Sequence, residues 1–140
     1  MRILFLGDVV GKSGCLAVTE NLPGLIKKKK IDFVIINGEN AADQGVGITE
    51  KISIDLFNSG ADVITTGNHV WDQKEALGYI DKENRLLRPE NLIDPSPGKG
   101  FEIFNTKNNF KIGVLNLMGN IFMKKCDDVF ETAQKFIEKN

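Results

Sequence analysis

Three short apolar runs in this chain each end in a glycine that is followed by polar side chains. The runs cover residues 2–6, 32–37 and 61–66, and the segments that follow them have helical spacing of apolar residues. Short apolar runs that alternate with helices are typical of strands buried in a parallel sheet, because parallel strands need a crossover connection. We therefore predict an α/β fold with a largely parallel sheet flanked by helices.

The remaining segments predict further helices, a loop and a hairpin. One helix should run to about Lys30, and Pro23 should divide it because proline removes an amide donor from a helix interior. Thr49 suits the N-cap of a helix that ends near Asn58. We expect a further helix over residues 72–80, a loop over 88–100, strands over 101–104 and 111–117 around a turn at 105–109, and an amphipathic helix over 128–139. Without a repeat or linker, residues 1–140 are predicted to form a single domain.

The composition argues against several classes of function. A formal net charge of −1 offers no basic surface for bulk binding of nucleic acid. The apolar run at residues 3–6 is too short for a signal peptide or a membrane span, so we expect a cytoplasmic protein without membrane association. Cys15 and Cys126 belong to no metal-binding or redox pattern and are expected to be reduced thiols. Because His69 is the only histidine, a metal site must be rich in oxygen ligands or completed by another chain.

Polar side chains directly follow each of the three predicted strands. Asp8 follows the first strand, Glu39 and Asn40 follow the second, and Asn68 and His69 follow the third. The carboxyl ends of parallel strands share one edge of a sheet, so we expect these side chains to converge there. Two carboxylates at short range repel unless a cation lies between them, and a carboxylate that bridges two divalent ions is a standard part of two-metal phosphoryl chemistry. A nearby imidazole could protonate the leaving oxygen.

Each of these residues also has a simpler local explanation. Asp8 could cap the following helix, residues 39–40 could form a loop turn, and His69 could be a structural histidine. The segment 7–13 also ends in Gly-Lys-Ser, like a phosphate-binding P-loop, but three residues instead of four separate its glycines and Asp8 would repel phosphates. The repetition of polar groups at three successive strand ends favours a metal site over these alternatives.

The same residues carry a resemblance to a known family. Gly-Asp-Val-Val-Gly at 7–11, Asn-Gly-Glu-Asn-Ala-Ala at 37–42 and Gly-Asn-His-Val-Trp-Asp at 67–72 resemble the YmdB-like branch of bacterial metallophosphoesterases. The resemblance implies the N-terminal part of a calcineurin-like sandwich, a site for two divalent ions (iron or manganese), and phosphodiesterase activity on small phosphodiesters such as 2′,3′-cyclic nucleotides. It further implies roles for site residues: metal ligands at Asp8, Glu39, Asn40 and Asn68, with Glu39 as the bridge, and His69 as the general acid or phosphate contact.

One departure from that family leaves the activity of this chain open. Later segments of the family carry His-Ala-Glu and Gly-Thr-His-Thr-His motifs that supply further metal ligands, and this sequence contains neither. We therefore expect an incomplete ligand set that holds Mn²⁺ or Mg²⁺ weakly through oxygen atoms. Three alternatives stay open: a phosphodiesterase completed by a C-terminal half or a homo-oligomer, a truncated remnant without activity, and a non-catalytic module that binds nucleotide or phosphate.

Overall fold

The computed structural model describes residues 1–93, 95–106 and 108–139, and it contains a parallel sheet, a separate hairpin and four helices within these ranges. Positions 94 and 107, which fall in the predicted loop and turn, lie outside the described residues. In chain order the elements are β1 (Ile3–Leu6), α1 (Gly11–Lys29), β2 (Phe33–Asn37), α2 (Glu50–Asn58), β3 (Val63–Thr65), α3 (Ala76–Tyr79), β4 (Leu86–Leu87), β5 (Phe101–Asn105), β6 (Lys111–Leu115) and α4 (Val129–Lys139).

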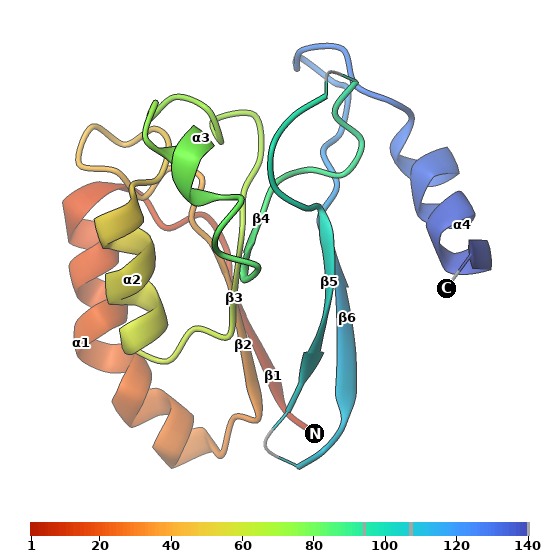
Figure 1. Ribbon diagram of the computed structural model, residues 1–140. Coiled ribbons are helices and arrows are strands. Elements are labelled where there is room, and N and C mark those ends of the chain that lie inside the picture. The colour runs from red at the N-terminus through yellow and green to blue at the C-terminus, as the bar shows by residue number, and fades with distance from the viewer. Residues whose placement is uncertain (94, 107, 140) are drawn as a thin grey trace.

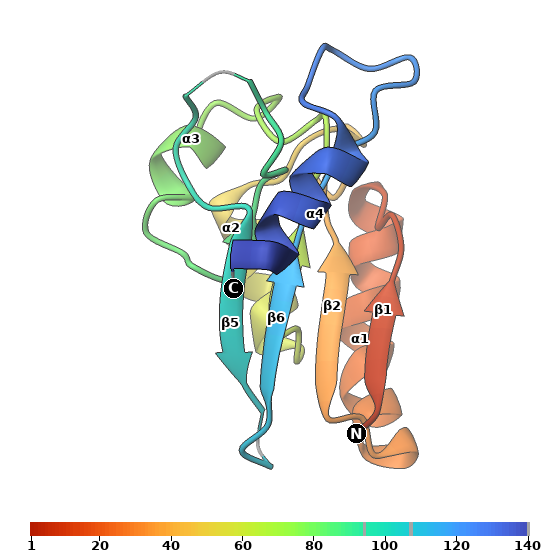
Figure 2. The same cartoon turned by 90° about the vertical axis from the view of Figure 1, so that its right-hand side faces the viewer.

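The four strands β1 to β4 form one parallel sheet in the order of the sequence. Helices α1 and α2 lie on one face of this sheet, and the antiparallel pair of β5 and β6 lies on the other face (Figure 1). The parallel strands therefore all end at the same edge, which is at the top of Figures 1 and 2. The predicted α/β fold, with its parallel sheet, C-terminal hairpin and final helix, is confirmed.

Two hydrophobic clusters fill the spaces on either side of the sheet. The larger cluster packs the sheet against α1 and α2, and alternate strand residues such as Val34, Ile36 and Ile64 point into it. The smaller cluster packs the sheet against the hairpin around Phe33 and Val63. Because side chains alternate along a strand, the sheet is buried on both faces over its middle strands.

Three details of the predicted elements were wrong or missing. Helix α1 runs without a break through Pro23, because Leu22 is only 2% exposed and its packing outweighs the lost amide bond. The helix predicted over residues 72–80 is limited to α3, since Gln73 donates from Nε2 to the carbonyl of Val46 at 2.9 Å and holds the preceding residues in turns. The sequence did not indicate β4, which has only two residues.

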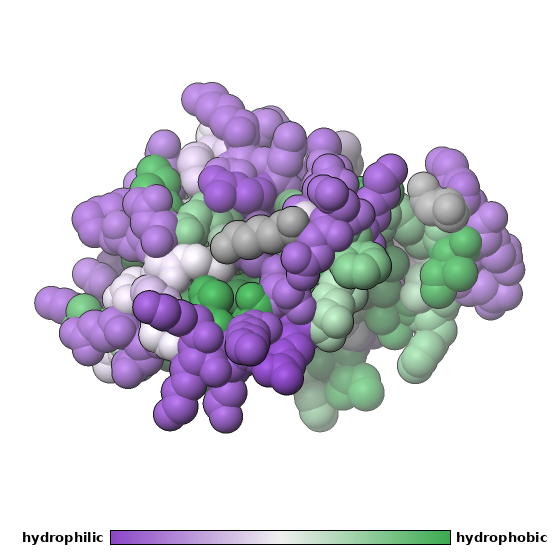
Figure 3. All heavy atoms as spheres, turned by 90° about the horizontal axis from the view of Figure 1, so that it is seen from below, coloured by the Kyte–Doolittle hydropathy of each residue, from purple (hydrophilic) through white to green (hydrophobic). Residues whose placement is uncertain are grey.

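Part of the molecule presents apolar side chains to solvent. On β1, Ile3 is 48% and Phe5 is 59% exposed on the face turned away from α1. In Figure 2 nothing lies in front of β1, and in Figure 3 the hydrophobic side chains gather on the side of the hairpin and α4. Helix α4 buries none of its described residues, although Phe136 stacks on Phe101 with ring centroids 4.7 Å apart. Within the described ranges, no helix combines the length and the apolar character needed to cross a membrane.

Candidate metal site at the strand ends

The ends of β1 and β2 are joined by backbone hydrogen bonds that place Asp8 beside Asn40. The amide of Val9 donates to the carbonyl of Asn37 at 3.0 Å, and the amide of Gly11 donates to the carbonyl of Asn40 at 2.8 Å. Across this connection the side-chain Nδ2 of Asn40 donates to Oδ1 of Asp8 at 2.8 Å. Helix α1 has Val10 at its N-cap and no side-chain cap, so Asp8 does not act as a helix cap.

The carboxamide of Asn40 is the feature of this edge that most clearly suits a bound cation. Its Nδ2 donates a hydrogen bond to Asp8, whereas its Oδ1 is buried and has no hydrogen-bond partner among the described residues. A buried polar atom without a partner costs about 1–3 kcal/mol, so such atoms need an explanation. A cation bound next to the Asp8 carboxylate would satisfy this oxygen, because amide and carboxylate oxygens are the ligands that hard divalent ions prefer.

Glu39 is fixed between the ends of β2 and β3. Its amide donates to Oδ1 of Asn37 at 3.0 Å, and Nδ2 of Asn37 donates to Oε1 of Glu39 at 3.3 Å. The amide of His69 approaches the other carboxylate oxygen at 3.4 Å. The carboxylate lies directly over Gly67, where an added Cβ would overlap both oxygens, so only glycine permits this close approach.

His69 and Asp72 form a pair next to this carboxylate. Nδ1 of His69 lies 2.6 Å from Oδ2 of Asp72, and the imidazole is 35% exposed. With Asp72 accepting the Nδ1 proton, Nε2 is the ring nitrogen that can exchange a proton with a ligand. The sequence analysis did not assign a role to Asp72, although its position three residues after His69 in a run of turns is the signal that could have found it.

A groove of about 540 Å³ connects this edge of the sheet with the hairpin. Glu39 and Asn68 line it from the parallel sheet, and residues 114–119 line it from β6 and the segment that follows. Asn116 fixes the two sides together, because its Nδ2 donates to the carbonyls of Thr66 at 2.8 Å and Leu87 at 3.0 Å. The structure therefore brings Asp8 to Asn40, and Glu39 to His69, by direct contacts, and it places Asn68 in the same groove as Glu39.

The donor set is unusual because half of it consists of amides. Across residues 1–93, 95–106 and 108–139, no three His, Cys, Asp or Glu side chains lie close enough together to hold a metal ion. Only Asp8 and Glu39 of the four expected ligands belong to those residue types, and the other two are asparagines. The roles of these four residues as metal ligands stay predictions.

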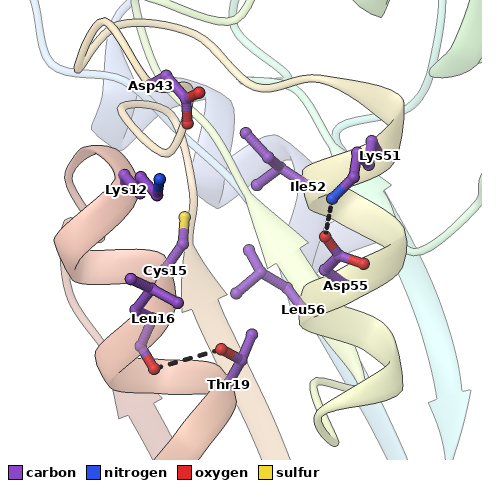
Figure 4. A pocket seen from close by; sticks show the side chains of 9 residues that line it. All are labelled: Lys12, Cys15, Leu16, Thr19, Asp43, Lys51, Ile52, Asp55 and Leu56. Carbon is purple, nitrogen blue, oxygen red and sulfur yellow. Dashed lines mark hydrogen bonds and ion pairs between the residues drawn. The ribbon is translucent and has the colours of Figure 1, made fainter.

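A second cleft, of about 250 Å³, lies between α1 and α2 and is separate from the strand-end groove (Figure 4). Cys15 points into it, and its thiol donates to the carbonyl of Ala41 at 3.2 Å. Burial, followed by the nearby charges of Asp43 and Asp55, raises the pKa of the Cys15 thiol above its ordinary value. The thiol is therefore protonated at neutral pH and is a poor nucleophile.

The sequence and the fold of this chain match those of known proteins over nearly its whole length. The model of the family described as YmdB-like protein matches residues 4–140. The chain belongs to this family. The 2′,3′-cyclic-nucleotide 2′-phosphodiesterase of Bacillus subtilis is 49% identical over 137 residues, which are 98% of this chain and 51% of that protein.

Two solved structures share the fold. A novel phosphatase of Mycoplasma pneumoniae superposes with a TM-score of 0.91 and 34% identity, covering 100% of this chain and 51% of the other. A hypothetical protein of Thermus thermophilus superposes with a TM-score of 0.90 and 36% identity, covering 100% and 54%. The chain thus spans about half the length of the relatives it matches, and the predicted membership of the YmdB-like family is confirmed.

Proposed function

We propose that this chain carries the strand-end part of a metal-dependent phosphodiesterase that hydrolyses small phosphodiesters such as 2′,3′-cyclic nucleotides. The family membership and the name of the Bacillus subtilis relative support the reaction class. The buried, unpartnered Oδ1 of Asn40 beside the Asp8 carboxylate is the observation that carries the proposal. A strand end with a purely structural role is not expected to bury an amide oxygen that has no hydrogen-bond partner.

The proposed site holds two divalent ions, with Mn²⁺ or Mg²⁺ suited to its oxygen ligands and iron as the other metal implied by the resemblance. Asp8, Glu39 and Asn40 would hold one ion, and Glu39 and Asn68 the other. Bound metal would supply charge to polarise the phosphate and to activate water. Asn37 holds Glu39 through two hydrogen bonds, one to its carboxylate and one from its backbone amide, so this ligand would need little rearrangement on binding.

His69 is proposed to give a proton to the leaving oxygen of the substrate. Asp72 holds the Nδ1 side of the ring at 2.6 Å and orients Nε2 for this transfer. Proton transfer by a positioned side chain contributes roughly 10²- to 10⁴-fold to a rate. The pair therefore serves catalysis, whereas the four oxygen ligands serve binding of the ions.

The first experiment measures bound Mn²⁺ and turnover on the purified chain, with bis-p-nitrophenyl phosphate and 2′,3′-cyclic AMP as substrates. We expect Glu39→Ala to lose both bound Mn²⁺ and turnover. His69→Ala should keep the bound Mn²⁺ and lose about 100-fold or more in turnover, because it removes only the proton donor. Glu20→Ala, which removes an exposed carboxylate from α1, is the matched control and should change neither quantity.

Two results would contradict this proposal. One is a folded wild-type sample that binds no Mn²⁺ and turns over neither substrate. The other is turnover that survives Glu39→Ala, since a contaminating activity or a different site would then be responsible. The proposal would also lose its specific basis if Asn40→Ala bound Mn²⁺ as tightly as the wild type does, because the unpartnered Oδ1 of Asn40 would then have no role in binding.

A second candidate is that the chain forms one part of a composite site. Phe5 lines the strand-end groove and is also 59% exposed, so the apolar face of β1 and the site are continuous. A second polypeptide seated on this face would cover apolar surface and could add ligands to the groove. We expect turnover to rise on addition of a polypeptide with the sequence of the second half of the Bacillus subtilis relative, and Phe5→Asp to abolish that rise.

A further inference from the structure

A second hollow adjoins the strand-end groove on the side away from β1. It has a volume of about 130 Å³, and Gly67 and Asn68 line both it and the groove. Its other described walls are polar and apolar, and they include Trp71, Leu92, Ile93, Ser96, Met118, Lys124 and Lys125. Among the described lining residues there are two ammonium groups and no carboxylate. A hollow with this lining attracts anions.

Lys124 and Lys125 belong to a segment that is fixed at its base. The side chain of Asn91, which is 1% exposed, accepts from the amide of Met118 at 2.9 Å and donates to the carbonyl of Asp127 at 2.8 Å. Both ends of the segment 118–127 are thereby held by one buried residue. In Figures 1 and 2 this blue segment before α4 lies at the same end of the molecule as the carboxyl ends of β1 and β2.

The charges of this segment are separated between two surfaces. Asp127 and Asp128 follow the two lysines closely, but they line a different groove beside α4. Neither Lys124 nor Lys125 forms an ion pair within the part of the chain that the structure describes. Among residues 1–93, 95–106 and 108–139, the two ammonium groups therefore have no carboxylate partner that would compete with an external anion.

We propose that this hollow is a subsite for a second, non-reacting phosphate of a nucleotide substrate. The inference rests on the proposed function, because it places the reacting phosphate at the strand ends, next to Asn68. Since Asn68 lines both spaces, a ligand whose one phosphate lies at the strand ends has its next phosphate at Lys124 and Lys125. Lysine binds phosphate as a point charge through charge-assisted hydrogen bonds. The substrate class is thus nucleotide phosphodiesters that carry a second phosphate besides the one that reacts, which narrows the proposed function.

Trp71 makes the subsite directly observable, because it is the only tryptophan in the chain and lines the hollow. The experiment titrates the full chain in Mn²⁺ buffer with adenosine 3′,5′-bisphosphate, adenosine 5′-monophosphate and inorganic phosphate, and follows Trp71 fluorescence. We expect the bisphosphate to bind about tenfold more tightly than the monophosphate, as one additional charge-assisted contact predicts. In the double variant Lys124→Gln/Lys125→Gln this ratio should fall to about twofold or less.

The matched control is Lys28→Gln/Lys29→Gln, which removes two charges from the last turn of α1 and should keep the tenfold ratio. Equal affinity for bisphosphate and monophosphate, a ratio that survives Lys124→Gln/Lys125→Gln, or equally tight binding of inorganic phosphate would each overturn the subsite. Turnover of bis-p-nitrophenyl phosphate separates the two proposals. A preference for bisphosphate without any turnover refutes the catalytic proposal and leaves the subsite, whereas turnover without the preference refutes the subsite alone.

Discussion

The two faces of the parallel sheet differ in how completely they are covered. Toward α1 and α2, Ile36 and Ile64 are fully buried in the larger hydrophobic cluster. Toward the hairpin, burial is restricted to the middle of the sheet, and Ile3 and Phe5 on the edge strand β1 stay about half exposed. One face therefore supplies most of the hydrophobic stabilisation, and the other face leaves apolar side chains exposed.

This difference explains how the candidate site can be well positioned in a sheet with one open face. The carboxylates of Asp8 and Glu39 accept hydrogen bonds from residues at the ends of β1, β2 and β3, and these strands pack on the helices. The opposite wall of the groove comes from β6, which is joined to the sheet through Asn116. The ligands thus depend on the covered face, whereas access to them depends on the hairpin.

The largest expected effect compares a residue on the covered face with one on the open face. Leu56→Ala removes a fully buried side chain of α2 and should lower the free energy of unfolding by about 3 kcal/mol. Phe5→Ala removes a larger side chain that is 59% exposed, and the loss should be less than about 1 kcal/mol. Urea denaturation followed by circular dichroism measures both values.

A loss for Phe5→Ala as large as that for Leu56→Ala would contradict the comparison. It would mean that the open face is covered in solution, for example by a second copy of the chain. Sedimentation of the wild type and of Phe5→Ala at several concentrations would then separate self-association from burial within one chain. Concentration-independent monomers with a small Phe5→Ala effect are the expected result.

Periodicity and turn chemistry in the sequence predict most of the fold. The strand ends at Asp8, Glu39 and Asn68 were located from apolar runs that stop at glycine, and the structure puts all three at one edge of the sheet. The cap at Thr49 was also predicted, and its Oγ1 accepts from the amide of Ile52 at 3.2 Å. These features are local, so the sequence around each position contains the information that determines it.

Features that depend on tertiary contacts could not be predicted in this way. β4 exists because two leucines pair with β3, and a run of two residues has no measurable period. The roles of Asn37 and Asn116 depend on carbonyls and carboxylates brought near by folding, so an asparagine in an apolar segment is the only signal in the sequence. The pairing of His69 with Asp72 required the turns that replace the predicted helix over residues 72–80.

A smaller effect is expected where the two faces are joined. Asn116→Ala removes the Nδ2 donor from the carbonyls of Thr66 and Leu87, of which Leu87 keeps the donors from Thr66, and we expect the free energy of unfolding to fall by about 2 kcal/mol. Asn105→Ala, at the exposed end of β5, is the matched control and should cost less than about 0.5 kcal/mol. Both are measured by urea denaturation. Equal losses would show that Asn116 does not connect the hairpin to the sheet.

The smallest expected effect concerns the pH dependence of an ion pair at the edge of the helical face. Arg85 donates from Nε and Nη2 to Glu83 at 2.8 and 2.6 Å, and its guanidinium lies 3.9 Å from the centre of the Phe57 ring of α2. The hydrogen bond from Arg85 lowers the pKa of the Glu83 carboxyl below its ordinary value. At pH values near the pKa of Glu83, the folded state therefore binds fewer protons than the unfolded state, and the free energy of unfolding rises with pH.

This stabilisation is complete above the unfolded pKa of about 4.3 and is lost as pH falls through the lower pKa of the folded state. Glu83→Gln should therefore reduce the slope of unfolding free energy against pH below about pH 5, with a loss of roughly 0.5–1 kcal/mol at neutral pH. Glu131, which pairs with Lys135 on the exposed surface of α4, provides the contrast. Glu131→Gln should change the free energy of unfolding less than Glu83→Gln does, because solvent screens an exposed pair on α4, where no described residue is buried. If both variants change the profile equally, α4 is more firmly packed than the open face implies, and the difference between the two faces is smaller than the burial of their side chains indicates.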